Sequence, residues 1–281
     1  MKKIFIVGPT ASGKSSLAHE LALKIGGEII CADSQTIRKD LDIGTAKPTK
    51  AEREEVPYHL LDIIEPYDSF SVAEYVRLAQ QAIDECITRG KTPIIVGGTG
   101  LYVDALFFGF SFNKHNQHDR DKLQKKSVKE LHSIIEKKGY PFPENTQNPR
   151  HLIGMILRQG ALPVDQEPIE GAVMFGIQTS DNVLKQRIHD RVSEMFDAGF
   201  LEEAQAVFKK YGKPQKKMDA IGYPIALRHL TGEISKQEAQ DLFRQADWQY
   251  ARRQKSWLRR NKYITWLSNE NSKLDQILET L

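Results

Sequence analysis

The residues best suited to chemistry lie at the beginning of the chain, where a glycine-rich segment follows the apolar run 4–7. Residues 8–15 match the phosphate-binding pattern G-x-x-x-x-G-K-[ST]. In such a loop, backbone N–H groups surround an anion, the following helix adds its dipole, Lys14 supplies a mobile charge and the Ser15 hydroxyl can bind Mg²⁺. The residues expected to hold phosphates are Gly8, Pro9, Thr10, Ala11, Ser12, Gly13, Lys14 and Ser15.

Asp33 is the second residue that could do chemistry, because it directly follows a predicted buried strand at 28–32. A carboxylate beside a phosphate loop can bind Mg²⁺, anchor a substrate or act as a general base. Nucleoside triphosphates, substrates of nucleotide kinases and organic diphosphates all suit such a loop. Lys14 and Asp33 alone would favour a nucleotide kinase. Against a kinase, the strand predicted at 92–96 runs into Gly-Gly-Thr instead of an aspartate, and no compact arginine-rich lid is apparent.

The order of the predicted elements indicates how these residues are positioned. Apolar runs alternate with helical patterns in the first third of the chain, which is typical of a parallel sheet. Ligands of open α/β sheets bind outside the carboxyl ends of the strands, so Lys14, Asp33 and Thr99 should face one crevice.

The pattern changes near residue 111, and no strand is predicted from there to about residue 171. Two helical stretches, at about 119–138 and 149–159, are joined there by a proline-containing linker. Strand patterns return at 172–177 and, after a mostly helical stretch, at 263–267.

These patterns predict a fold of the α/β class, a P-loop NTPase-like parallel sheet flanked by helices. The sheet and its helices would form a catalytic core of residues 1–112 and 172–281. Residues 113–171 would form an all-helical insertion domain.

A long helix is predicted at about 235–261. Phe243, Ala246, Tyr250 and Trp257 fall on one face of it and are expected to belong to the core. Basic residues on another face could lean toward phosphate groups or toward water, namely Arg252, Lys255 and Arg259.

Composition and charge restrict the class of protein. The 281 residues are 40% hydrophobic, which is enough for a core, and no window approaches the roughly 18 apolar residues of a membrane span. Cys31 and Cys86 show no metal-ligand spacing and no disulfide framework, which fits core positions in a reducing cytosol. The net charge is only +3, but basic segments at 114–138, 209–217 and 252–262 together favour a nucleic-acid partner.

Five segments together resemble the bacterial tRNA dimethylallyltransferases. They occur in that family's order and spacing over essentially the whole chain, at residues 8–15, 32–34, 42–48, 96–102 and 251–259. The third and fourth segments are specific to this family and its relatives, unlike the phosphate loop. The resemblance implies transfer of a dimethylallyl group from dimethylallyl diphosphate to the exocyclic amine of the adenosine just 3′ of a tRNA anticodon, with release of diphosphate.

The resemblance also implies roles for particular residues. The loop would hold the diphosphate of the donor with Mg²⁺ on Ser15, and Asp33 would accept the proton of the attacking amine. The catalytic residues implied are Asp33, Thr99, Lys14 and Arg187. The residues implied in tRNA binding are Asp33, Ser34, Gln35, Thr36, Thr99, Arg120, Arg150 and His151. The protein would be a cytoplasmic monomer without a membrane anchor, and its insertion domain would clamp the tRNA anticodon stem-loop.

The chain departs from the family's pattern at several positions. Thr36 stands where a base-reading Gln is usual, Gly154 stands in place of an Arg, and Pro224 replaces a basic residue. Three other functions remain open on the sequence: prenyl transfer to free AMP or ADP, phosphoryl transfer by a nucleotide kinase, and RNA binding without catalysis.

Overall fold

The structure is a computed structural model that describes residues 1–110, 116–143, 145–157, 167–214, 220–268 and 271–281. The predicted helix end at residue 159 and parts of the basic segments 114–138 and 209–217 lie outside the described residues. Cys31 and Cys86 are both free and buried, as predicted. Within the described ranges, no helix combines the length and the apolar character that crossing a membrane requires.

The larger of two compact units, Met1–Gly109 with Ile169–Leu281, is built on a six-stranded parallel sheet of order β3-β2-β4-β1-β5-β6. The strands are β1 (Lys3–Val7), β2 (Glu28–Cys31), β3 (Tyr58–His59), β4 (Pro93–Gly97), β5 (Ala172–Ile177) and β6 (Ile264–Leu267). The central strands are rich in Ile, Val and Phe because both faces of the sheet are covered. Sequence patterns predicted every strand except β3, whose two residues are too few to form a pattern.

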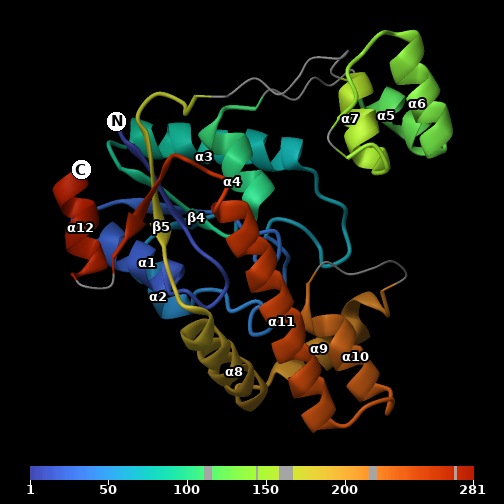
Figure 1. Ribbon diagram of the computed structural model, residues 1–281. Helices are drawn as coiled ribbons and strands as arrows, with labels where there is room; N and C mark the ends of the chain where they lie inside the picture. Colours follow the sequence, from blue (N-terminus) through green and yellow to red (C-terminus); the bar gives the residue numbers. More distant parts are fainter. Residues whose placement is uncertain (111–115, 144, 158–166, 215–219, 269–270) are drawn as a thin grey trace. The chain divides into compact units, whose positions relative to one another are not determined.

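Helices cover both faces of this sheet (Figure 1). α3 (Val72–Thr88) and α4 (Gly100–Phe107) pack against one face. α1 (Lys14–Ile25) and α12 (Lys273–Thr280) pack against the other face. Successive side chains of β1 point alternately into these two layers, as the pleat of a strand requires. The predicted α/β fold with a parallel sheet flanked by helices is confirmed.

Further helices lie beyond the sheet. The remaining helices of this unit are α2 (Lys50–Glu55), α8 (Asp181–Asp197), α9 (Phe200–Tyr211), α10 (Gly222–Leu230) and α11 (Lys236–Leu258). α8 to α11 share an apolar cluster that includes Phe200 and Phe243. Arg252 on α11 and Arg259, which caps the C-terminus of this helix, are exposed to water, whereas Lys255 forms an ion pair with Asp181.

The predicted core face of α11 is partly wrong. Phe243 is buried, but Ala246, Tyr250 and Trp257 are only half-buried. The buried positions are Ala239, Phe243, Asp247, Ala251, Gln254 and Leu258. Two of these side chains are polar because the second half of α11 lies against the phosphate loop and not only against apolar residues.

The second unit, Phe110–Pro168, contains α5 (Asn116–Gln124), α6 (Val128–Lys137) and α7 (Pro149–Leu157), and its described residues include no strand. The prediction of one helix over 119–138 is wrong. Ser127 interrupts it, since its hydroxyl accepts a 3.3 Å hydrogen bond from the Glu130 N–H while the Glu130 carboxylate accepts one of 2.7 Å from the Ser127 N–H. This reciprocal cap starts a new helix.

Candidate active site

The phosphate loop leaves β1 at Gly8 and enters α1 at Lys14. Gly13 has a φ of 90°, a left-handed conformation that favours glycine. A Cβ atom on Gly8 would lie 2.5 Å from the Ser12 hydroxyl, so a side chain here would displace that hydroxyl. The Ser12 N–H donates to the Pro9 carbonyl at 3.2 Å, which closes the turn. The loop therefore has the compact shape of an anion-binding turn at a helix N-terminus.

A cavity of about 290 Å³ lies beside this loop. Its polar lining comes from segments far apart in the sequence: Lys14 and Ser15 on α1, Asp33 after β2, Arg191 on α8, and Asp247 with Tyr250 on α11. Apolar side chains form another part of the wall, among them Leu61 and Val96. We call this space the loop cavity. It brings together a phosphate loop, the carboxylates of Asp33, Glu52 and Asp247, and an apolar surface.

Lys14 is a half-buried cation that lines the loop cavity. Its Nζ donates to the Pro9 carbonyl at 3.3 Å. Burial lowers the pKa of Lys14 to about 8; Asp33 opposes this shift, and the positive charge of Arg191 adds to it. The ammonium group is therefore mostly charged at pH 7 and loses its proton at mildly alkaline pH.

We expect the affinity for inorganic diphosphate to fall as the pH rises through 8. The free protein binds the anion best when Lys14 is protonated, so each pH unit above about 8 should cost up to about tenfold in affinity. Calorimetric titrations from about pH 6 to about pH 10 measure this. Because diphosphate itself changes protonation over this pH range, Lys14→Met serves as the reference for that contribution. Parallel pH profiles of the two proteins would contradict the expectation.

The segment that carries Asp33 is held by short-range hydrogen bonds. Asp33 Oδ1 accepts a 2.8 Å hydrogen bond from the Gln35 N–H, and the Ser34 N–H donates to Thr99 Oγ1 at 3.0 Å. Gln35 and Thr36 line the loop cavity together with Asp33. The structure thus brings Asp33, Gln35 and Thr36 to the cavity beside the phosphate loop, and Ser34 contacts Thr99 instead.

Thr99 was predicted to face the same crevice as Lys14 and Asp33, but it lies just outside the loop cavity. It does not line the loop cavity, because its hydroxyl is engaged by Ser34. Thr99 also interacts with Tyr250, whose side chain does line the cavity. Lys14 and Asp33 therefore face one crevice, as predicted, and Thr99 supports its edge.

Residues 44–48 form one wall of the loop cavity, and charged side chains hold this wall in place. Lys47 is 9% exposed; its Nζ donates to the Asp42 carboxylate at 2.7 Å and also pairs with Asp62. Glu203 on α9 accepts hydrogen bonds of 2.8–3.0 Å from three successive backbone N–H groups at the start of this loop. The wall therefore depends on a carboxylate from a distant helix.

Glu203→Gln is expected to lower the free energy of unfolding by about 1–3 kcal/mol, because the backbone donors lose a charged acceptor. Urea unfolding measures the change. The neighbouring and exposed Glu202 supplies the control, Glu202→Gln, which should unfold like the unaltered protein. Equal stability of both variants would show that the carboxylate does not hold the loop.

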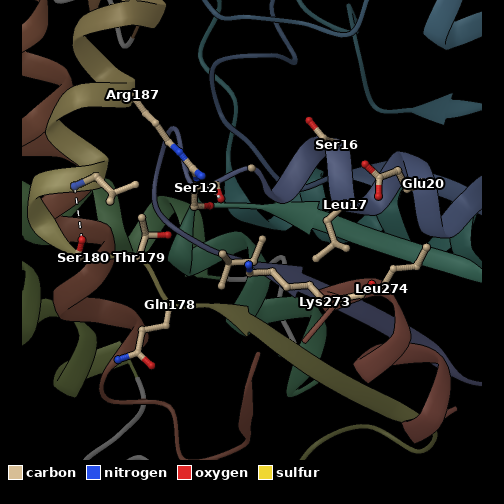
Figure 2. A pocket seen from close by; sticks show the side chains of 14 residues that line it. Ser12, Ser16, Leu17, Glu20, Gln178, Thr179, Ser180, Arg187, Lys273 and Leu274 are labelled. Carbon is tan, nitrogen blue, oxygen red and sulfur yellow. Dashed lines mark hydrogen bonds between the residues drawn. The ribbon is translucent and has the colours of Figure 1, made fainter. Parts of the chain in front are cut away.

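The two arginines of α8 lie in different places. Arg187, a predicted catalytic residue, lines a second cavity of about 530 Å³ and reaches toward Ser12, whose carbonyl accepts from Arg187 Nη1 at 3.2 Å (Figure 2). Arg191, one turn further along α8, lines the loop cavity instead. Its Nη1 donates to Thr10 Oγ1 at 2.5 Å. Of the two, Arg191 is the one that shares a cavity with Lys14.

Three side chains of this site were not predicted from the sequence, namely Arg191, Asp247 and Gln254. Arg191 follows Arg187 at a spacing of four, the helical repeat that places both on one side of α8. Asp247 and Gln254 interrupt the buried stripe of α11. The signal available in the sequence for these two residues was their polar character within an otherwise apolar helix face.

The predicted tRNA-binding residues of the second unit lie on its surface. Arg120 on α5 and Arg150 and His151 on α7 are all exposed. Arg150 lies in the first turn of its helix, where its N–H donates to Asn148 Oδ1 at 3.0 Å. These side chains are accessible to a partner.

The fold and the loop cavity define a class of protein. A phosphate loop after β1 of a parallel sheet, with a carboxylate after β2, two strands away, and apolar side chains beside the loop, is typical of a P-loop α/β protein whose ligand carries phosphate.

Comparisons with known proteins identify the family. The IPP transferase family matches residues 36–261, and the isopentenyl transferase family matches residues 1–63. The tRNA dimethylallyltransferase of Pelotomaculum thermopropionicum is 36% identical over 95% of this chain and 91% of its own length. The chain belongs to the IPP transferase family, and the resemblance seen in its motifs is confirmed.

Solved structures agree with this membership. The full-length tRNA isopentenylpyrophosphate transferase of Bacillus halodurans is 32% identical, with a TM-score of 0.74 over 99% of this chain and 95% of that one. A eukaryotic dimethylallyltransferase acting on tRNA is 23% identical, with a TM-score of 0.80 over 99% of this chain and 77% of that one. The second likeness shows the shared fold.

Proposed function

We propose that this chain transfers a dimethylallyl group from dimethylallyl diphosphate to the exocyclic N6 amine of the adenosine 3′-adjacent to the anticodon in tRNA, releasing diphosphate. The observation that carries the proposal is the loop cavity, where a phosphate loop, Asp33 and an apolar surface meet. The loop suits the diphosphate, and the apolar surface suits the branched hydrocarbon of the donor. We infer the acceptor from the relatives named above, since their names describe transferases acting on tRNA.

In this reaction the amine nitrogen bonds to the allylic carbon while the bond from that carbon to the diphosphate oxygen breaks. The amine proton passes to Asp33, which lies beside the loop. Negative charge grows on the leaving diphosphate, next to the N–H groups of residues 13–15 and the side chains of Lys14 and Arg191. Groups already positioned for that charge stabilise the transition state more than the ground state. No phosphoryl group is transferred.

Magnesium fits the loop cavity by the chemistry of its oxygen donors. The Ser15 hydroxyl and the carboxylates of Asp33 and Asp247 line the same space. Ser15, in the first turn of α1, would hold the ion. Bound there, it would neutralise part of the diphosphate charge.

The proposed macromolecular partner is the anticodon stem-loop of tRNA. An adenine in that loop must leave its stack to enter a cavity beside the phosphate loop. The side chains proposed to contact the acceptor nucleotides are Asp33, Ser34, Gln35, Thr36 and Thr99. Exposed basic side chains of the insertion domain, residues 113–171, would bind RNA phosphates, namely Arg120, Arg150 and His151. The protein would act as a monomer in the cytoplasm, where tRNA is modified.

A competition assay tests the acceptor. The protein is incubated with radiolabelled dimethylallyl diphosphate, Mg²⁺, AMP and an unmodified tRNA with adenosine 3′ of the anticodon; the control tRNA has guanosine there. Label should enter only the first RNA. Preferential labelling of AMP would assign the activity to free nucleotides, and no transfer over a panel of tRNAs would contradict the proposal.

A further inference from the structure

Asp247 is the most unusual side chain of the loop cavity. It is 4% exposed, although it lines the cavity, and its Oδ2 has no hydrogen-bond partner among the described residues. A buried carboxylate normally has partners for both oxygens, because an unsatisfied one loses its water without compensation. Oδ2 is therefore placed to meet a ligand that the cavity receives.

The position of Asp247 is fixed by Gln254, seven residues later on the same buried face of α11. Gln254 Oε1 accepts a 2.7 Å hydrogen bond from the Thr10 N–H, and its Nε2 donates to the Gly98 carbonyl at 3.0 Å. These two bonds attach α11 to the phosphate loop and to the end of β4. Asp247, two turns earlier, is thereby held over the cavity.

The end of β4 cannot supply a carboxylate of its own. A Cβ atom on Gly97 would lie 2.0 Å from the Ala32 carbonyl oxygen, and one on Gly98 would lie 2.2 Å from Gln254 Nε2. In P-loop enzymes that transfer phosphate, an aspartate from a strand end helps to hold Mg²⁺. Here α11 occupies the space next to β4, and it brings its own carboxylate into the cavity.

The charges around Asp247 favour a cation as its partner. The pKa of Asp247 is raised, mainly because the carboxylate is buried. The positive charges of Arg191 and Lys14 oppose this shift, and the negative charge of Asp33 adds to it. When a diphosphate binds, Arg191 and Lys14 are drawn to its oxygens, and Asp247 then faces a polyanion. That arrangement is repulsive unless a positive ion lies between them. Mg²⁺ commonly binds through one or two carboxylates together with substrate phosphates.

We propose that Asp247 is a ligand of the divalent cation that binds with the diphosphate in the loop cavity. The inference rests on the proposed use of a diphosphate donor. No group of three or more His, Cys, Asp and Glu side chains suited to a metal occurs in the part of the chain that the structure describes. The diphosphate must therefore supply several of the ligands, and tight binding of the cation requires it.

Mn²⁺ binding in the presence of inorganic diphosphate tests the inference, with the free ion measured by electron paramagnetic resonance. Asp247→Asn should weaken Mn²⁺ binding at saturating diphosphate at least about tenfold. Asp241→Asn is the matched control, since Asp241 lies on the same helix with a side chain that is 60% exposed, and it should bind Mn²⁺ like the unaltered protein. Without diphosphate, all three proteins should bind Mn²⁺ weakly.

Unchanged Mn²⁺ affinity of Asp247→Asn would overturn the inference. So would a loss of affinity for the anticodon stem-loop with Mn²⁺ binding intact, because Asp247 would then contact the acceptor. Thermal unfolding shows whether the variant is folded, and Asp247→Ser replaces it if it is not. The measurement uses neither prenyl donor nor tRNA, so its outcome is separate from that of the prenyl-transfer assay.

Discussion

Asp33→Ala is expected to lower the turnover number for prenyl transfer by about 10²–10⁴-fold, while the affinity for tRNA changes little. Asp33 lies in the loop cavity beside the phosphate loop, where it can take the proton of the attacking amine. Its loss removes the proton acceptor and leaves the phosphate-binding groups in place. Single-turnover rates with saturating donor and tRNA measure the chemical step, and a filter-binding titration measures RNA affinity.

Asp33→Asn separates the proton acceptor from the local structure. Its side-chain oxygen can still accept the hydrogen bond that Gln35 N–H donates to Oδ1. We therefore expect the asparagine variant to fold normally and to be nearly as slow as the alanine variant. A rate close to that of the unaltered protein in either variant would remove Asp33 from the proposed mechanism.

Arg191→Met is expected to lower the turnover number by about 10²–10³-fold, because the half-buried Arg191 lies, with Lys14, beside the site where the diphosphate charge grows. Steady-state kinetics with dimethylallyl diphosphate as the varied substrate measure the effect. Arg187→Met is the matched comparison on the same helix.

The expectation for Arg187 is smaller. Its side chain is exposed and donates to the Ser12 carbonyl, so it steadies the phosphate loop through one hydrogen bond. Losing one such bond should cost less than about tenfold in rate. A larger effect of Arg187→Met than of Arg191→Met would instead support the catalytic role that the family resemblance implied for Arg187.

The elements that position the site were largely predictable because each has a local signal. The apolar runs around Phe5 and Ile95 marked central strands, and the glycines of residues 8–15 marked the loop between β1 and α1. The break before α6 also had a local signal, since Ser127 and Glu130 form a capping pattern inside an otherwise helical stretch. The prediction of one continuous helix followed the apolar spacing on both sides of Ser127 and disregarded this capping pattern.

The remaining part of the site depends on contacts between distant segments, for which a sequence carries little signal. Asp247 and Gln254 have helical spacing, but only the packing of α11 on Gly98 turns them toward the phosphate loop. The choice between Arg187 and Arg191 is also a matter of tertiary position, because residues one turn apart on a helix have the same local pattern. Glu203 holds residues 42–44 from a helix that begins more than 150 residues later.

The phosphate loop therefore takes its proposed role from its surroundings. A nucleotide kinase and a prenyltransferase can share the loop itself. What distinguishes this chain is the glycine pair after β4, the packing of α11 in their place and the apolar wall that includes Leu61 and Val96. These features favour a ligand in which a diphosphate is attached to a hydrocarbon and leaves intact.

The most direct test of that claim is the fate of the diphosphate. One reaction with dimethylallyl diphosphate, Mg²⁺ and an unmodified tRNA is analysed both for inorganic diphosphate and, by mass spectrometry of the digested RNA, for the modified nucleotide. The account predicts equal amounts of diphosphate and of adenosine prenylated at N6, at the position 3′ of the anticodon. Transfer of phosphate to an acceptor, or diphosphate release without prenylated RNA, would contradict it.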